Sequence, residues 1–380
     1  MNLPVYSTFK KPAASEVSMK FTKLRAEMAK ASLSGVRFRG TDWFAWITGG
    51  ANPVVFFPPE QGIAEVFVTA SGAWILTDRI ESVRLVEEEL SPNFEIFECA
   101  WTDKPGAYDA FIKKTCGPNA VVASDRPSLG LNERTLPDAI VELRLTFTPQ
   151  EIERYRMLGR DAGLAMERAL LAAKPDWTEF DLAAAGASEQ WKLGIEPVLA
   201  LVSGDARLSI RRHPMPTSDK LGGRAMMVFS ARRHGLYANI TRFVYFRKPS
   251  ETELKHHTDL MKIEQAVLDA TQPGATLESC YAAVSSAYAE TGYAEELLNH
   301  HQGGTCGYGS REKFAAIKSA VDTRNLIREN SAVAWNPSLP GAKLEDTFLV
   351  QARGLLNMTL VDSCPVKEFG GRKRPWFYEG

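Results

Sequence analysis

The second half of the chain contains the same helix-start pattern twice, and this repetition limits the folds it can adopt. Residues 174–179 and 272–278 each combine a proline, a threonine and a glutamate, and each precedes an alanine-rich helical stretch. Pro175 and Pro273 are 98 positions apart, which is far longer than the repeat of a solenoid protein. The pattern predicts two copies of one α/β unit related by pseudo-symmetry, or two helix starts that resemble each other by chance.

Apolar segments typical of strands lie around these helix starts. We expect strands over 225–229, 237–246, 332–335 and 346–350, with a turn at 232–235 joining the first two. The second half is therefore predicted to pack helices on a curved, mostly antiparallel sheet.

The first part of the chain alternates between helical and strand-like segments. Residues 19–28 predict a helix, with Phe21, Leu24 and Met28 facing the core and Lys20, Lys23 and Glu27 on the other side. Residues 64–68 and 73–77 predict a hairpin, and 120–123 a short buried strand. This alternation indicates an α/β domain.

A helix start at Thr148 separates the two parts. Thr148 is a suitable N-cap, Pro149 suits the first helical position, and Glu151 completes a capping box. We expect a long amphipathic helix from there to about Leu171. The predicted domains are 1–147 and 148–380.

Composition excludes several classes of protein. The 45 basic and 46 acidic residues leave a net charge of −1, which argues against a nucleic-acid or membrane-surface partner. No apolar run reaches the roughly 18 residues that span a bilayer, and the first residues lack the order of a signal peptide. The five cysteines form no CxxC pair, so neither a disulfide framework nor a zinc ribbon is expected. These features predict a soluble, cytoplasmic protein.

Three short motifs carry a resemblance to a known family. They are Lys343–Val350 followed by Gly354, His301–Gly304, and Asn239–Arg242. Residues 148–365 resemble the α+β pita-bread fold of methionine aminopeptidase, aminopeptidase P, prolidase and creatinase. Residues 1–147 resemble the smaller α/β N-terminal domain of the creatinase–prolidase branch, and Trp46–Gly49 is similar to a strand-end segment found there.

The resemblance implies a metal site, which this sequence does not preserve. The family's metallopeptidases hold two metal ions with two aspartates, one histidine and two glutamates, and the ions activate a shared water. The matching positions here are Val228, Asn239, His301, Asn336 and Glu345. Valine cannot coordinate, and neutral asparagines cannot offset the charge of two dications. We therefore expect neither a metal nor another cofactor.

The resemblance to creatinase implies that such a fold can work without metal. In the mechanism of creatinase a histidine acts as acid and base, and glutamates orient a guanidinium. Counting from Ser203–Asp205 without a gap places Arg211 at the histidine position, whereas a short shift places His213 there. His213 is favoured because histidine titrates near neutral pH; the alternative is a solvated loop histidine. The expected catalytic residues are His213, His301 and Glu345.

Further polar residues are expected around the same pocket. Glu345 would bind a substrate amine, or else pair internally with Arg242 or His301. Asn239 and Asn336 would hydrogen-bond to a polar ligand or to each other. Arg311 and Glu312 would face the cavity or form an exposed ion pair. The predicted substrate-binding residues are Asn239, Asn336, Arg242, Arg311 and Glu312.

Other polar residues have simpler interpretations. His300 would interact with a helix dipole, and His256 and His257 would lie on the surface. Cys306 would be either a nucleophile paired with His301 or a structural thiol.

Three functions remain open at this stage. The first is a metal-independent hydrolase or lyase of a small C–N bonded substrate. The second is a non-catalytic binding protein, and the third is a metallopeptidase with an unusual ligand set. The expected partners are a small molecule or short peptide and a second copy of the chain. The aromatic segment Trp43–Trp46 would serve the dimer contact or belong to a core strand.

Overall fold

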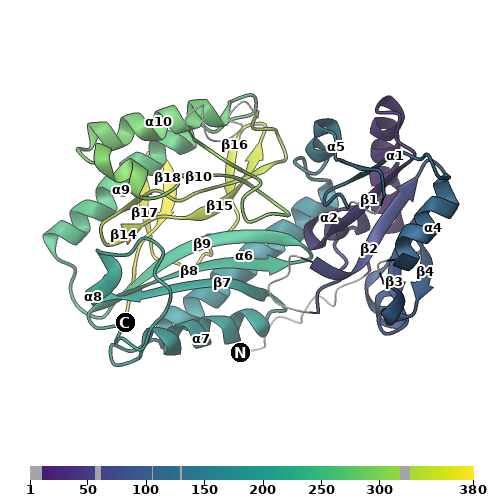
Figure 1. The fold of residues 1–380 in the computed structure, drawn as a ribbon. Coiled ribbons are helices and arrows are strands. Elements are labelled where there is room, and N and C mark those ends of the chain that lie inside the picture. Colours follow the sequence, from purple (N-terminus) through teal and green to yellow (C-terminus); the bar gives the residue numbers. More distant parts are fainter. Residues whose placement is uncertain (1–10, 56–60, 105, 129–130, 317–325) are drawn as a thin grey trace. The chain divides into compact units, whose positions relative to one another are not determined.

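The structure is a computed structural model that describes residues 11–55, 61–104, 106–128, 131–316 and 326–380 (Figure 1). The chain divides into two compact units, Met1–Glu151 and Ile152–Gly380, and the division falls in the first turn of helix α6 (Pro149–Ala172). The predicted capping box starts this helix. The Thr148 amide donates to Glu151 Oε2 at 2.7 Å, and the Glu151 amide donates to Thr148 Oγ1 at 3.2 Å.

The first unit is built on a six-stranded mixed sheet with the order β4-β3-β2-β1-β5-β6. The predicted hairpin is the antiparallel pair β2–β3, whereas β5 and β6 extend the sheet in parallel with β1. The strands are β1 (Gly35–Gly40), β2 (Gln61–Thr69), β3 (Ala73–Asp78), β4 (Glu95–Cys99), β5 (Val122–Ser124) and β6 (Glu133–Thr135). The helices are α1 (Ala14–Lys30), α2 (Thr41–Thr48), α3 (Ser82–Arg84), α4 (Gly106–Cys116) and α5 (Asp138–Glu142), with short helical segments at Leu85–Glu89 and Trp101–Asp103.

Helix α1 buries the predicted apolar face, including Phe21, Leu24 and Met28. The placement of Lys20 on the exposed side was wrong. Lys20 is 2% exposed, and its ammonium lies 3.1 Å from Glu16 and 2.7 Å from Glu151. A lysine inside an amphipathic helix can be buried in this way when carboxylates pair with its charge.

The aromatic segment Trp43–Trp46 is neither a strand nor an exposed surface. It lies in helix α2, where its residues are at most 6% exposed, and the rings of Trp43 and Phe38 stack at 5.1 Å. Gly49 ends the helix with a left-handed φ of 79°, so the resemblance of Trp46–Gly49 to a strand end was misleading. The segment belongs to the core and offers no exposed contact surface.

The second unit repeats one order of elements. Helices α6 and α7 (Glu179–Trp191) are followed by strands β7 (Glu196–Gly204), β8 (Arg224–Arg233) and β9 (Leu236–Tyr245). Helices α9 (Glu251–Ala270) and α10 (Leu277–Glu290) are followed by β10 (Gly303–Cys306), β12 (Ala332–Trp335) and β15 (Asp346–Gln351). Thr178 and Thr276 form the capping boxes that start α7 and α10. This repetition supports two copies of one unit over a chance likeness.

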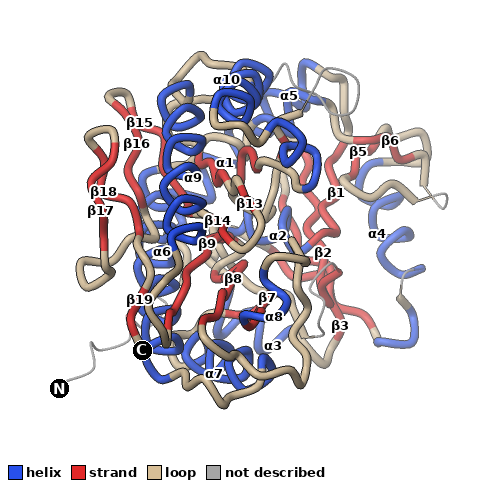
Figure 2. The backbone as a smooth tube through the Cα atoms, turned by 90° about the vertical axis from the view of Figure 1, so that its left-hand side faces the viewer, coloured by secondary structure: helices blue, strands red, loops and turns tan. Residues whose placement is uncertain are grey.

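Each copy contributes a sheet. One has the order β19-β9-β8-β7 and the other β11-β10-β12-β15-β16. In Figures 1 and 2, helices α9 and α10 lie above strands β8 and β9, and helix α7 lies below them. The remaining elements are α8 (Asp205–Leu208), the helical segment Ala294–Asn299, β11 (Lys313–Phe314), β13 (Ser338–Leu339), β14 (Ala342–Lys343), β16 (Gly354–Asn357), β17 (Val366–Phe369), β18 (Arg372–Pro375) and β19 (Tyr378–Glu379).

The two sheets meet at an isolated bridge between Thr241 of β9 and Glu345, which immediately precedes β15. Beside the bridge lies a buried ionic network. Asp346 accepts from Arg242 at 2.6 Å and lies 3.0 Å from Arg374, which also pairs with Glu264. This network fixes the start of β15, the segment that carries Glu345.

No helix of the described residues is both long and apolar enough to cross a membrane. All five cysteines are free thiols, as their scattered spacing indicated.

Candidate functional site

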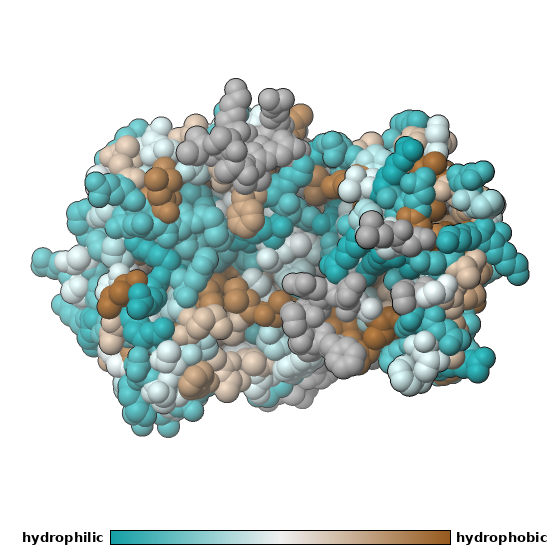
Figure 3. Space-filling view, in the orientation of Figure 1, coloured by the Kyte–Doolittle hydropathy of each residue, from teal (hydrophilic) through white to brown (hydrophobic). Residues whose placement is uncertain are grey.

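A cavity of about 340 Å³ opens in the second unit. Apolar side chains form one wall, and Figure 3 shows hydrophobic atoms, in brown, gathered where strands β7 to β9 run in Figure 1. His213 and the five positions that match the family's metal ligands all line it. The full lining is Leu199, Leu201, His213, Met215, Val228, Ser230, Asn239, His301, Ser310, Arg311, Phe314, Asn336, Lys343 and Glu345.

Strand register places much of this lining. Val228 and Ser230 are two residues apart on β8 and therefore face the same side of the sheet. Leu201 of β7 pairs with Val228, and Asn239 of β9 pairs with Ser230. Three neighbouring strands thus present one surface to the cavity.

The two asparagines differ in their environment. Asn239 Oδ1 accepts from Ser230 at 2.7 Å, and its Nδ2 donates to the Ser310 carbonyl at 3.1 Å. Asn336 is 2% exposed, and its Oδ1 has no hydrogen-bond partner among the described residues. The asparagines therefore do not bond to each other, and Asn336 keeps a buried polar atom for a ligand or a water.

Glu345 is surrounded by cations. Its Oε1 accepts from Arg311 Nη2 at 2.7 Å, while its Oε2 accepts from Thr241 Oγ1 at 2.9 Å and lies 3.3 Å from Lys343 Nζ. The predicted partners were wrong, because Arg242 reaches only the backbone carbonyl of Glu345, at 3.2 Å. Arg311 and Lys343 take the places that we expected for Arg242 or His301.

These contacts determine the ionisation of the group. Burial alone would raise the pKa of Glu345, but Lys343, Arg311 and Thr241 outweigh it and lower the pKa to about 2. Burial lowers the pKa of Lys343, and the attraction of Glu345 opposes that effect. Glu345 is therefore a carboxylate at neutral pH.

Three histidines gather beside the cavity, and two of them, His213 and His301, line it. His213 Nε2 lies 2.9 Å from His300 Nε2, and the rings of His300 and His301 stack at 4.6 Å. One side-chain nitrogen from each of the three lies within 4.8 Å of the others. Burial lowers the pKa of His213, of His300 to about 2 and of His301 to about 3, and Lys343 lowers all three further. All three are neutral at pH 7.

The hydrogen bonds assign the protons of two of these rings. His300 Nδ1 lies 2.5 Å from the His301 carbonyl, which can only accept, so Nδ1 carries the proton and Nε2 a lone pair. His213 Nε2 must then donate to His300 Nε2. The lone pair of neutral His213 is left on Nδ1, to which no described residue bonds.

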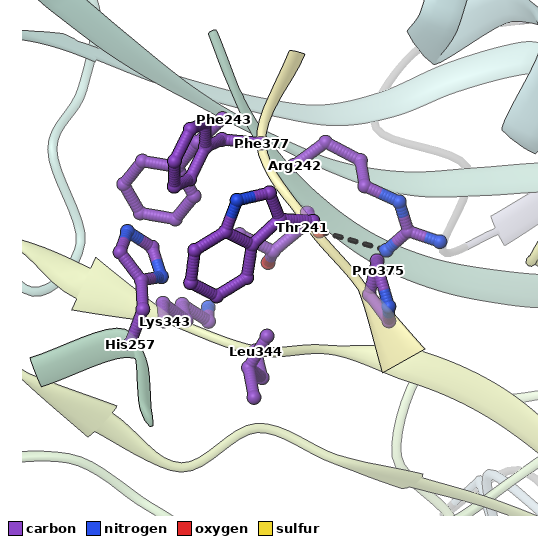
Figure 4. Close-up of a pocket in the computed structure, with 9 residues that line it drawn as sticks. Thr241, Arg242, Phe243, His257, Lys343, Leu344, Pro375 and Phe377 are labelled. Carbon is purple, nitrogen blue, oxygen red and sulfur yellow. Dashed lines mark hydrogen bonds between the residues drawn. The ribbon is translucent and has the colours of Figure 1, made fainter. Parts of the chain in front are cut away.

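Arg242 and Glu312 do not line the cavity. Arg242 is committed to Asp346 and to the Thr241 carbonyl, and in Figure 4 its guanidinium lies beside Pro375, away from His257. Glu312 accepts from the Gly309 amide at 2.9 Å. Their assignment as substrate-binding residues is therefore not supported by their positions.

Other predicted roles also change. His257 is 4% exposed and contacts the Tyr245 hydroxyl at 3.1 Å, so it is a core residue, because its face of α9 packs inward. Cys306 is buried beside the Tyr155 hydroxyl at 3.3 Å, and burial raises the pKa of its thiol to about 11. It is not an activated nucleophile. Arg211 is exposed and does not line the cavity.

Sequence reasoning missed three residues of this site: Lys343, Ser230 and His300. Lys343 was visible in the motif 343–350, two positions before Glu345, and an extended backbone turns such a pair to one side. Ser230 was likewise two positions after Val228. Nothing in the sequence near His300 indicated that the loop carrying His213 would reach it.

Comparisons with known proteins agree with this geometry. Residues 153–352 match the model of metallopeptidase family M24. The Xaa-Pro dipeptidase of Lactobacillus helveticus is 22% identical over 236 residues, which cover 59% of this chain and 62% of that relative. The match thus spans less than two thirds of the relative's length.

Two solved structures share the fold. The prolidase from Pyrococcus horikoshii OT3 has a TM-score of 0.76 at 18% identity, covering 90% of this chain and 99% of that one. The Xaa-Pro dipeptidase from Bacillus anthracis has a TM-score of 0.75 at 16% identity, covering 96% and 99%. The mixed α/β architecture with a pita-bread second unit is therefore established.

Proposed function

The chain belongs to metallopeptidase family M24, and we propose that it is a hydrolase of small C–N bonded substrates that works without the family's two-metal centre. One observation carries this proposal. The carboxylate of Glu345, at the position of a metal ligand, is already paired with Arg311 and Lys343, and the free nitrogen of His213 belongs to the same cavity lining.

The residues present do not fit two metal ions. Val228 offers no ligand atom, and the amide of Asn239 is taken up by Ser230 and Ser310. Two dications a few ångströms apart need several carboxylates, and Glu345 is the single carboxylate of the lining. Its neighbours Arg311 and Lys343 would repel both ions.

His213 supplies the acid–base chemistry in this proposal. Nδ1 takes a proton from a water that attacks the substrate carbon, and later returns it to the leaving nitrogen. His300 is a positioning residue, because it accepts from His213 Nε2 in both protonation states of His213. Its own proton on Nδ1 is fixed by the His301 carbonyl.

The relatives suggest where to search for a substrate. Proteins called Xaa-Pro dipeptidase and prolidase are similar to this chain. We would test Xaa-Pro dipeptides together with small amides and ureas, using protein purified without added metal, before and after chelation. Hydrolysis that survives chelation and is lost in His213→Gln supports the proposal. Hydrolysis that disappears with the metal overturns it.

A second candidate is a peptidase with one metal ion on the three histidines. The close approach of the nitrogens of His213, His300 and His301 favours it, and so does the carbonyl that orients His300. His213 and His300 lie outside the five positions that match the family's metal ligands. Elemental analysis separates the candidates: this one requires about one ion per chain, lost in His300→Phe.

A third candidate is a binding protein that keeps the pocket without the chemistry. Two polar residues of the pocket already have partners within the chain, which favours this candidate: Asn239 bonds to Ser230, and Glu345 bonds to Arg311. It predicts ligand binding with no turnover of any substrate in the screen. We further propose a cytoplasmic homodimer, as the creatinase–prolidase resemblance suggests; light scattering giving a mass near 42.0 kDa at micromolar concentration would contradict the dimer.

A further inference from the structure

The charges around the cavity sum to a positive value. Arg311 and Lys343 are the basic side chains of the lining, and both contact Glu345, its single carboxylate. Two basic groups thus face one acidic group. An unpaired buried charge is costly in a cavity of low dielectric constant, so the site favours a ligand that brings the missing negative charge.

Both cations keep hydrogen-bond donors to offer. Lys343 is 4% exposed, and the one charged partner of its ammonium among the described residues is Glu345 at 3.3 Å. An ammonium has three donors, so capacity remains. Arg311 donates to Ser310 and Glu345, while its buried Nε has no partner among the described residues. The side chain of Arg311 is 8% exposed.

The rest of the lining describes the body of the ligand. Leu199, Leu201, Met215, Val228 and Phe314 give an apolar wall, and Asn336 places an unpartnered buried oxygen in the same cavity. A volume of about 340 Å³ is at the lower end for small-molecule pockets. The cavity thus combines a cationic end with apolar walls.

We propose that the substrate of this site carries an anionic group, a carboxylate on a compact apolar body, and that Lys343 and Arg311 bind that group where a metallopeptidase of this family would hold its metal ions. A substrate ammonium or guanidinium is excluded from this end, because Glu345 already has two cationic partners. Of the two roles expected for Glu345, this favours pairing within the chain over binding a substrate amine. That the bound anion is a substrate rests on the proposed function; that the site binds an anion does not.

Three probes of nearly one shape test the charge preference without any turnover. Benzoate is anionic, benzamide neutral and benzamidine cationic. Titration calorimetry at pH 7 and low salt should show benzoate binding at least about tenfold more tightly than benzamide, with no binding of benzamidine, because hydrogen bonds between charged groups are the stronger ones. Equal affinity for the three probes, or preference for benzamidine, overturns the inference.

Two matched variants then assign the preference to the site. Lys343→Met should reduce benzoate affinity to that of benzamide, whereas Lys248→Met removes one exposed positive charge from the same unit and should leave it unchanged. If both variants behave alike, the preference arises from the general field of the protein and the inference is wrong. If Lys343→Met does not fold, the probe series on the unaltered protein still decides.

The outcome is separable from that of the proposed function. Benzoate selectivity together with no hydrolysis in the screen rejects the hydrolase and keeps an anion-binding pocket. Hydrolysis of a cationic substrate keeps the hydrolase and rejects the anionic substrate. In the first case the ligand is bound without being a substrate.

Discussion

The ammonium nitrogen of Lys343 lies 3.3 Å from a carboxylate oxygen of Glu345, so the residue that matches a metal ligand has a cation supplied by its own chain. Both side chains are at most 4% exposed. A buried carboxylate needs positive charge nearby, and in a metallopeptidase of this family the metal ions provide it. Here Lys343, with Arg311, meets the same electrostatic need.

Glu345→Gln should destabilise the fold. The substitution leaves the buried cations Lys343 and Arg311 without a carboxylate, and breaking a buried ion pair by removing one partner costs about 3–5 kcal/mol. Urea unfolding should show a loss of this size in the free energy of unfolding. Glu368→Gln, which changes an exposed glutamate, serves as the control and should alter it by less than about 0.5 kcal/mol.

The contribution of Glu345 should depend on pH in one direction. Because its pKa is lowered from 4.5 to about 2, its stabilisation is fully present above about pH 4.5 and is lost as the pH falls towards 2. The difference of roughly 2.5 pKa units corresponds to about 3 kcal/mol. Unfolding curves of the wild type and Glu345→Gln should therefore converge between these pH values. A constant gap would show that Glu345 is not ionised in the folded protein.

Local signals in the sequence predicted most of the second unit. Capping residues such as Thr148 and Thr276 have a short-range mechanism, so their hydrogen bonds follow from spacing alone. The strands around Val228 and Asn239 were recognisable from their apolar runs. Failures came where tertiary contacts override local pattern: Lys20 and His257 lie on faces that looked exposed and pack inward.

The sequence predicted which residues line the cavity better than it predicted which of them bond to each other. Matching motifs placed Val228, Asn239, His301, Asn336 and Glu345, and all five line one cavity. The partners of Glu345 were not predictable, because the distance from Arg311 to Glu345 depends on how a loop folds over β9. Hydrogen-bond partners between such loops follow from three-dimensional packing and leave no periodic signal in the sequence.

His213→Gln should reduce kcat on the substrate found in the screen by about 10²–10⁴-fold, the usual contribution of a general base. KM should change little if the glutamine fills the same space. Arg211→Gln, an exposed neighbour outside the cavity, is the matched control and should retain activity. Loss of activity in Arg211→Gln instead would favour the ungapped alignment of the family's histidine position.

The pH dependence of kcat/KM should have its acidic limb below the ordinary histidine pKa of 6.5. The base must be unprotonated, and burial beside Lys343 lowers the pKa of His213. Activity is therefore retained through neutral pH and falls only in acid. His300→Phe removes the acceptor that stabilises protonated His213, so the limb should move to still lower pH. A merely structural role for His300 would lower activity without moving the limb.

Asp346→Ala should unfold more easily than any surface variant, because Asp346 anchors the strand that carries Glu345. Arg242, which is 3% exposed, has Asp346 as its carboxylate partner at 2.6 Å, and among the described residues Arg374 would keep Glu264 as its carboxylate partner. Leaving the Arg242 guanidinium uncompensated should cost about 3–5 kcal/mol in the free energy of unfolding. The exposed pair Asp269–Arg372, with the same 2.6 Å separation, provides the control.

In Asp269→Ala, solvent screening limits the loss to below about 1 kcal/mol. Asp346→Asn keeps the shape of the side chain and one hydrogen-bond acceptor. Its loss in the free energy of unfolding should therefore lie between those of Asp346→Ala and Asp269→Ala.

Asp346→Asn also tests whether the ionic network around Asp346 positions the residues of the cavity. Under conditions where Asp346→Asn remains folded, benzoate affinity should weaken, since β15 begins at Asp346 and the preceding residue holds both Lys343 and Arg311 in place. Unchanged affinity in a folded but destabilised Asp346→Asn would mean that the network supports the fold without setting the geometry of the cavity.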